Sequence, residues 1–267
     1  MRKWAAGVAL LGVGVVLLVA VVRHTLFPAK TRAVQPDSFL ADAGRLPPPQ
    51  QPAFRVGRPK LLDRREARAW FAPVRRAVDA RSRPHQSARP IAPLGLQTSE
   101  GTTNIVLVIR ERRESDGLWV RVRLPVLPNT LTGWVPRSAL GGYHFVQTHL
   151  VVDRERFTAT LFEDRRKVFS APVGVGKPES PTPAGEFYVR DRLSGFGDPF
   201  YGPVAFGTSA RSEVLTDWPA GGFVGIHGTN EPALIPGRIS HGCIRLRNAD
   251  ILRLSRLMPV GTPVTIR

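Results

Sequence analysis

The chain has 267 residues, of which 42% are hydrophobic, so it is long enough for one or two domains with a sizeable core. Its formal net charge of +17 first suggests nucleic-acid binding. The distribution argues against that, because residues 1–140 hold 23 Lys and Arg against 9 Asp and Glu, whereas residues 141–267 hold 15 against 12. The basic part also lacks the interleaved aromatic residues that are typical of single-strand binders. We therefore predict no nucleic-acid partner and interpret the excess as solvated linker charge or as contact with anionic lipid headgroups.

Residues 1–27 contain a candidate membrane segment. Residues 4–22 carry no charge, and basic residues flank them on both sides, which predicts one N-terminal transmembrane helix that anchors the chain in a membrane. A cleaved signal peptide is the alternative, although its apolar core is usually shorter. Lipoprotein processing is excluded, since no cysteine follows the apolar run.

Residues 28–71 are rich in Pro, Arg, Ala and Gln and show no apolar period. This composition predicts a disordered or semi-rigid linker that carries the rest of the chain away from the membrane.

Residues 72–140 predict a small all-β module. Thr103–Arg110 is an apolar run, and Leu118–Leu124 alternates apolar and basic residues at the period of a half-buried strand. Together with the closing Gly-Trp-Val segment at 133–135, the series resembles a bacterial SH3-like domain, which implies a small β-barrel. That resemblance implies binding to wall components or peptides, and a plain spacer is an equally open interpretation.

Residues 141–267 read as a second, mainly β domain. A hairpin is expected over residues 150–162 and a closing strand over Val260–Ile266. The stretch Asp191–Gly222 is rich in Gly, Pro and aromatic residues, which predicts a long lid or binding loop. A short helix is expected over Ala249–Met258, with Asn248 as its N-cap.

Cys243 is the only cysteine, and it lies in the segment SHGCIRL, 16 residues after His227 in the segment IHGTN. A thiol nucleophile needs a nearby base, and either His227 or His241 fits by type. Spacing alone does not choose between them. A buried structural cysteine and a zinc site are the alternatives, but H-x13-H-x-C lacks a fourth ligand, so we expect no metal.

These two segments, followed by Gly-Thr-Pro-Val at 261–264, resemble the catalytic domain of bacterial L,D-transpeptidases. The segment VGVGKPESPTPAGEFYV at 173–189 is also similar to that family, and the resemblance covers residues 141–267. It implies a β-sandwich catalytic domain with a short helix.

The resemblance implies that Cys243 is the nucleophile and that His227 is its base, oriented by the carbonyl of Gly228. His227 either takes the thiol proton during attack or already holds it as an ion pair. Backbone N–H groups from His241 to Cys243 are expected to meet the oxyanion. His241 is predicted as a catalytic residue together with Cys243, His227 and Gly228. The predicted substrate-binding residues are Ser240, Gly242, Arg245, Tyr201 and Trp218. For Arg245, a solvent-facing strand position is the alternative.

The activity implied is transfer between stem peptides of peptidoglycan, forming 3→3 cross-links through a cysteine thioester, without a cofactor and without a stable protein partner. The predicted location is the cell envelope, with the catalytic domain outside the cytoplasmic membrane. An L,D-carboxypeptidase, a protein-to-wall transferase and a non-catalytic wall-binding scaffold remain alternatives, because the acceptor leaves no motif.

Overall fold

The structure is a computed structural model that describes residues 68–195, 198–215 and 222–267. All of these belong to one compact unit, Val56–Arg267. Among them, no helix is long and apolar enough to cross a membrane. The predicted helix over residues 4–22, most of the predicted linker and Trp218 lie outside the described residues, so these predictions stay predictions.

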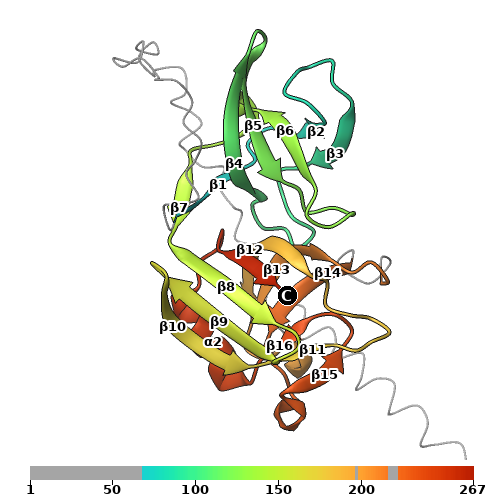
Figure 1. The fold of residues 1–267 in the computed structure, drawn as a ribbon, viewed down its shortest axis with the longest axis vertical. Helices are drawn as coiled ribbons and strands as arrows, with labels where there is room; N and C mark the ends of the chain where they lie inside the picture. Colours follow the sequence, from blue (N-terminus) through green and yellow to red (C-terminus); the bar gives the residue numbers. More distant parts are fainter. Residues whose placement is uncertain (1–67, 196–197, 216–221) are drawn as a thin grey trace, which may run out of the picture. The chain divides into compact units, whose positions relative to one another are not determined.

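The described part of the chain is mainly β with one short α-helix, as the sequence predicts, and its strands form two sheets (Figure 1). The first β module, residues 69–146, is a seven-stranded sheet in the order β3-β2-β6-β5-β4-β1-β7. It extends beyond residues 72–140 on both sides. Its elements are β1 (Ala69–Pro73), β2 (Val78–Arg81), β3 (Pro90–Leu94), β4 (Ile105–Glu114), β5 (Gly117–Arg123), β6 (Thr132–Pro136), the 3-10 helix η3 (Arg137–Ala139) and β7 (His144–Val146).

Strand β5 confirms the alternation read from the sequence. Val120 and Val122 are buried, while Arg121 and Arg123 between and after them are partly exposed. This is the period of a strand with one face on a core. The resemblance of the first β module to an SH3-like domain stays a prediction.

The second β module, residues 148–266, contains a ten-stranded sheet in the order β10-β9-β8-β17-β12-β13-β14-β16-β11-β15. Its strands are β8 (Thr148–Asp153), β9 (Thr158–Glu163), β10 (Arg166–Pro172), β11 (Gly174–Gly176), β12 (Gly185–Ser194), β13 (Val204–Arg211), β14 (Phe223–His227), β15 (Gly237–Ser240), β16 (Ile244–Arg245) and β17 (Pro263–Ile266). Its helices are η4 (Pro199–Tyr201), η6 (Pro232–Leu234) and α2 (Asn248–Leu257).

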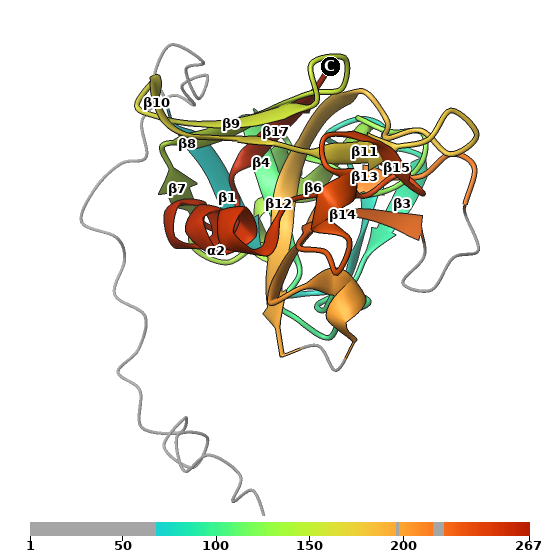
Figure 2. The same cartoon turned by 90° about the horizontal axis from the view of Figure 1, so that it is seen from below.

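Strand β12 belongs to both halves of this sheet. Its first residues pair with β17, and its residues from Val189 onward pair with β13. In Figure 2, β8, β9 and β10 run along one side of the module, while α2 and β14 lie on the other. Helix α2 contacts β10 and β13. The module therefore has two layers joined through β12.

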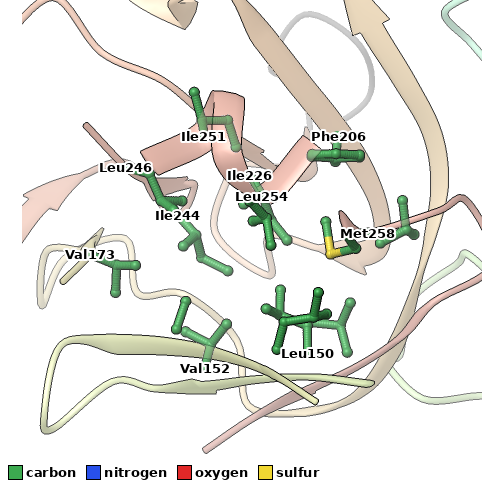
Figure 3. Close-up of a cluster of buried hydrophobic side chains, with 14 of the residues drawn as sticks. Leu150, Val152, Val173, Phe206, Ile226, Ile244, Leu246, Ile251, Leu254 and Met258 are labelled. Atoms are coloured by element: carbon green, nitrogen blue, oxygen red, sulfur yellow. The ribbon is translucent and has the colours of Figure 1, made fainter. Parts of the chain in front are cut away.

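The core of the second β module lies between these layers. Figure 3 shows Leu150 and Val152 of β8 facing Ile226, Ile244 and Leu254 across it, and all five are fully buried. Burying an aliphatic side chain of this size contributes about 1.5–3 kcal/mol to folding. This core fixes β14 and β16, the two strands whose ends carry the expected catalytic residues.

The expectation of one long loop over Asp191–Gly222 is wrong for the described residues, although several of them line the same pocket as Cys243. Strand β12 continues to Ser194, η4 follows, and Val204–Arg211 forms β13, which pairs with both β12 and β14. The glycines and aromatic residues misled the sequence reading. They are the composition of a central strand buried on both faces, which shows no period-two alternation.

Polar contacts hold the two modules together. The side chain of Asn129 accepts from the backbone N–H of Arg211 at 2.9 Å and donates to its carbonyl at 2.8 Å. The hydroxyl of Tyr188 donates to the carbonyl of Ile105 at 3.1 Å. The first β module is thereby fixed against β12 and β13.

Candidate active site

Cys243 lies at the end of a tight turn between β15 and β16. Within this turn, the hydroxyl of Ser240 accepts from the N–H of Gly242 at 3.1 Å and donates to the carbonyl of Cys243 at 2.5 Å. Gly242 has a φ of +118°, a conformation that favours glycine. Ser240 and Gly242 therefore shape the turn that presents the thiol.

Thr182 ties this turn to the neighbouring strand β11. Its buried hydroxyl accepts from the N–H of Gly176 at 2.8 Å and donates to the carbonyl of Gly242 at 2.8 Å. In the sequence, Thr182 appears only as part of the segment at 173–189 that resembles the family. Its link to Gly242 joins residues 60 positions apart, which no local pattern signals.

His227 ends β14, which pairs in parallel with β16, so that His227 lies in register with Arg245. Its Nδ1 lies 2.6 Å from the carbonyl of Gly228, and a carbonyl only accepts, so Nδ1 carries the proton. Its Nε2 is buried and has no hydrogen-bond partner among the described residues. Nε2 is therefore the basic nitrogen that is left to receive a proton.

Gly225 lies beside both the imidazole and the thiol. It lies two positions before His227 on β14, so both residues face the same side of the strand. A Cβ built on Gly225 would lie 3.7 Å from Cδ2 of His227 and 3.8 Å from Sγ of Cys243. The N–H of Gly225 also donates to Sγ at 3.4 Å. The sequence analysis missed this residue.

The local environment favours the neutral forms of both groups. Burial lowers the pKa of His227 to about 4; the Gly228 carbonyl raises it, and the charge of Arg245 lowers it. Burial raises the pKa of the Cys243 thiol, opposed by the N–H of Gly225 and by Arg245. Of the two protonation schemes left open by the sequence, this arrangement fits a neutral thiol beside a neutral imidazole.

The turn after His227 is held by Asn248. The Oδ1 of Asn248 accepts from the N–H of Thr229 at 2.9 Å, and a Cβ on Gly228 would come within 2.4 Å of the same oxygen. Position 228 therefore needs glycine. The N-cap of α2 is Arg247, so the predicted capping role of Asn248 is wrong.

A pocket of about 320 Å³ opens in front of these groups. Cys243, His227, Ser240 and the exposed His241 line it. Tyr201 of η4 lies with its ring 5.1 Å from that of His227, edge to face. Thus most of the expected site residues meet in one place. Gly242 lies behind the pocket wall, with its N–H already bound to Ser240.

Arg245 is not on a solvent-facing strand, so that alternative is wrong. Its residue is only 4% exposed and lines the pocket. Its guanidinium lies 4.4 Å from the ring centre of Phe200 and 3.2 Å from the carboxylate of Glu231. The stacking and the ion pair fix a positive charge beside the thiol.

The described residues contain no group of three His, Cys, Asp or Glu side chains that could hold a metal ion. The site consists of a cysteine and a histidine that line one pocket. This arrangement suits acyl transfer through a thioester.

Residues 147–266 match the YkuD family model, the L,D-transpeptidase catalytic domain. The resemblance noted in the sequence is confirmed over this segment. The "Putative L,D-transpeptidase YkuD" of Bacillus subtilis (strain 168) is 38% identical over 118 residues, which are 44% of this chain and 65% of that protein. The "Probable L,D-transpeptidase YbiS" of Escherichia coli (strain K12) is 59% identical over 39 residues, or 15% of this chain and 13% of that protein.

Among solved structures, the catalytic domain of an Enterococcus faecium L,D-transpeptidase is 27% identical, covering 45% of this chain and 96% of that chain, with a TM-score of 0.34. The chain spans less than two thirds of the length of the first two relatives it matches, at 65% and 59%.

Proposed function

We propose that this protein is a peptidoglycan L,D-transpeptidase with Cys243 as its nucleophile. The observation that carries the proposal is the buried, unpartnered Nε2 of His227, whose imidazole and the Cys243 thiol both lie next to Gly225 and line the same pocket. The match of residues 147–266 to the L,D-transpeptidase catalytic domain supports the reaction class.

In the first half-reaction, Nε2 of His227 takes the thiol proton as sulfur attacks a carbonyl of the donor stem peptide. A C–S bond forms, and the oxyanion meets the backbone N–H groups of His241 and Cys243. When the C–N bond breaks, His227 returns the proton to the leaving D-amino acid. The product is a thioester on Cys243.

In the second half-reaction, an amine of another stem attacks the thioester carbon. His227 takes a proton from that amine and passes it to the departing sulfur, which restores the resting thiol. The cross-link joins two residues at the third position of their stems. No cofactor enters either step.

Arg245 and Tyr201 are proposed to bind the substrate. A guanidinium fixed beside the thiol suits a carboxylate of a stem peptide. Tyr201 lies against the ring of His227 and so forms the wall that a peptide would touch. The proposal also includes Trp218 as a substrate-binding residue and a membrane anchor over residues 4–22. The catalytic domain is proposed to lie outside the cytoplasmic membrane.

The proposal is tested by incubating purified protein with tetrapeptide stems and identifying the products by mass spectrometry. Cross-linked dimers are expected, with none from Cys243→Ala. Tripeptides alone would identify a carboxypeptidase. Unchanged stems would favour the wall-binding scaffold and overturn the proposal.

A further inference from the structure

The first β module contributes a carboxylate to the catalytic pocket. Glu100 lies in the loop between β3 and β4, yet it lines the same pocket as Cys243 and His227 in the second β module. The two modules are fixed against each other by hydrogen bonds of Asn129 and Tyr188. The pocket wall is therefore built by both sheets.

The loop that carries Glu100 is closed on itself. The Thr98 backbone N–H donates to the carbonyl of Thr102 at 2.9 Å, and their hydroxyls lie 2.9 Å apart. Gly101 takes a φ of +78° and its N–H donates to the carbonyl of Thr98 at 3.1 Å. These bonds hold the backbone of the loop in one conformation, so Glu100 is presented from a fixed position.

One oxygen of the Glu100 carboxylate lacks a partner. Oε1 accepts from the hydroxyl of Ser99 at 2.8 Å, whereas Oε2 is buried and has no hydrogen-bond partner among the described residues. Leaving a buried charged acceptor unsatisfied is unfavourable, because it has lost its water and gained nothing in exchange. Because Oε2 is buried, a bound donor would remove that penalty after the carboxylate rotates to turn Oε2 toward the pocket that Glu100 lines.

The charges around the pocket favour a cation beside Glu100, at the end away from Arg245. Among the described residues that line it, Glu100 is the only carboxylate and Arg245 the only guanidinium, and Arg245 lies beside the thiol. Asp191, buried behind Gly207, adds a second carboxylate close to Glu100. Two guanidiniums, of Arg190 and Arg211, stack on the ring of Phe223, which also lines the pocket. A substrate with a carboxylate near the thiol and an ammonium further away would match both ends.

We propose that Glu100 binds an ammonium group of the substrate, such as the side-chain amine of a diamino acid in a stem peptide. This inference rests on the proposed function and deepens it, because it assigns part of substrate specificity to the first β module. A primary ammonium carries three donors and a full positive charge, so it satisfies Oε2 better than a neutral amide would.

The test compares two tetrapeptide stems as acyl donors in the first half-reaction. They differ only at the side-chain amine, which is free in one and acetylated in the other, and thioester formation on Cys243 is followed by intact mass, so the amine is not needed as a nucleophile. The wild type is expected to reach half its maximal acylation rate at a roughly tenfold lower concentration of the free-amine stem, the scale of one charge-assisted hydrogen bond. Glu100→Gln should remove this preference by raising that concentration for the free-amine stem, with the maximal rate and the acetylated stem little changed. Glu163→Gln, at an exposed position on β9, is the matched control and should keep the preference.

Acylation of Cys243 by a β-lactam that carries no amine, followed by intact mass, tests the proposed nucleophile without involving Glu100. The proposed function and the inference on Glu100 can therefore fail separately. If stems turn over but Glu100→Gln leaves the preference unchanged, the inference on Glu100 is overturned and the proposed function stands. If neither stem turns over, the proposed function is overturned. Whether Glu100 binds the amine is then decided by calorimetry, which compares the binding of the two stems to Cys243→Ala protein with and without Glu100→Gln. Equal affinities for the two stems would overturn the inference there too.

Discussion

The resting protein should hold Cys243 as a neutral thiol, and this is open to direct titration. Burial raises its pKa above the ordinary value of 9.0, so at pH 7 at most about 1% of the protein should carry the thiolate. Burial also lowers the pKa of His227 to about 4, so the imidazole is not protonated at that pH. Moving the proton from sulfur to nitrogen before substrate binds is therefore unfavourable, because burial disfavours both the thiolate and the imidazolium.

The assay follows the ultraviolet absorbance of the thiolate and the rate of alkylation by iodoacetamide from pH 4 to pH 10. Cys243→Ala supplies the baseline for both, since Cys243 is the only cysteine. We expect a single rise that begins on the alkaline side, because only deprotonated sulfur absorbs and reacts. His227→Gln should leave the position of this rise nearly unchanged, since a neutral imidazole adds little charge.

A thiolate signal that is already full at pH 5 to 6 would refute this reasoning. It would mean that Cys243 and His227 form an ion pair before substrate binds, as cysteine–histidine pairs in other proteins do. The loss of that signal in His227→Gln would identify the imidazolium as its cause.

Three further predictions follow from the geometry. Gly225→Ala should fold normally, since its Cβ meets only ordinary contacts. Its methyl would contact both the imidazole and the sulfur, and by displacing them it should lower kcat about 100-fold. Gly142→Ala, with open space around it, is the control. Thr182→Val leaves two buried backbone groups unpaired and should lower the free energy of unfolding by about 3 kcal/mol in urea titrations, whereas Thr182→Ser should lose clearly less. Folding lowers the pKa of His227 from 6.5 to about 4, so the unfolded state binds a proton first as the pH falls. Between pH 7 and pH 4, the free energy of unfolding of the wild type should therefore fall by about 3 kcal/mol more than that of His227→Gln. Equal losses in the two proteins would contradict that assignment.

The sequence predicts the parts of the site that local patterns encode. The Ser240–Cys243 turn follows from residue types, because serine closes the turn through its hydroxyl and Gly242 adopts a positive φ. The alternation of β5 is equally local, since each side chain's face follows from its position along the strand. At these positions, the residues adjacent in sequence are the ones that determine the local structure.

The sequence does not predict contacts that join distant residues. Asn248 was expected to cap its own helix, yet its side chain accepts from Thr229, 19 positions away. Glu100 enters the pocket only because two sheets pack together. Strand β13 was mistaken for a loop, since burial on both faces removes the alternation by which a strand is recognised.

Burial is the main reason why the basicity of His227 is low, and its neutral partner offsets burial only in part. In Ser-His-Asp triads a carboxylate orients the imidazole and stabilises its charged form. Here the neutral carbonyl of Gly228 does the orienting, and Asn248 packs against Gly228 and binds the next backbone N–H. A carbonyl offers only a partial negative charge, while burial and Arg245 both disfavour the imidazolium. A proton on Nε2 is therefore short-lived, which suits a base that must pass it on to the leaving amine within the same half-reaction.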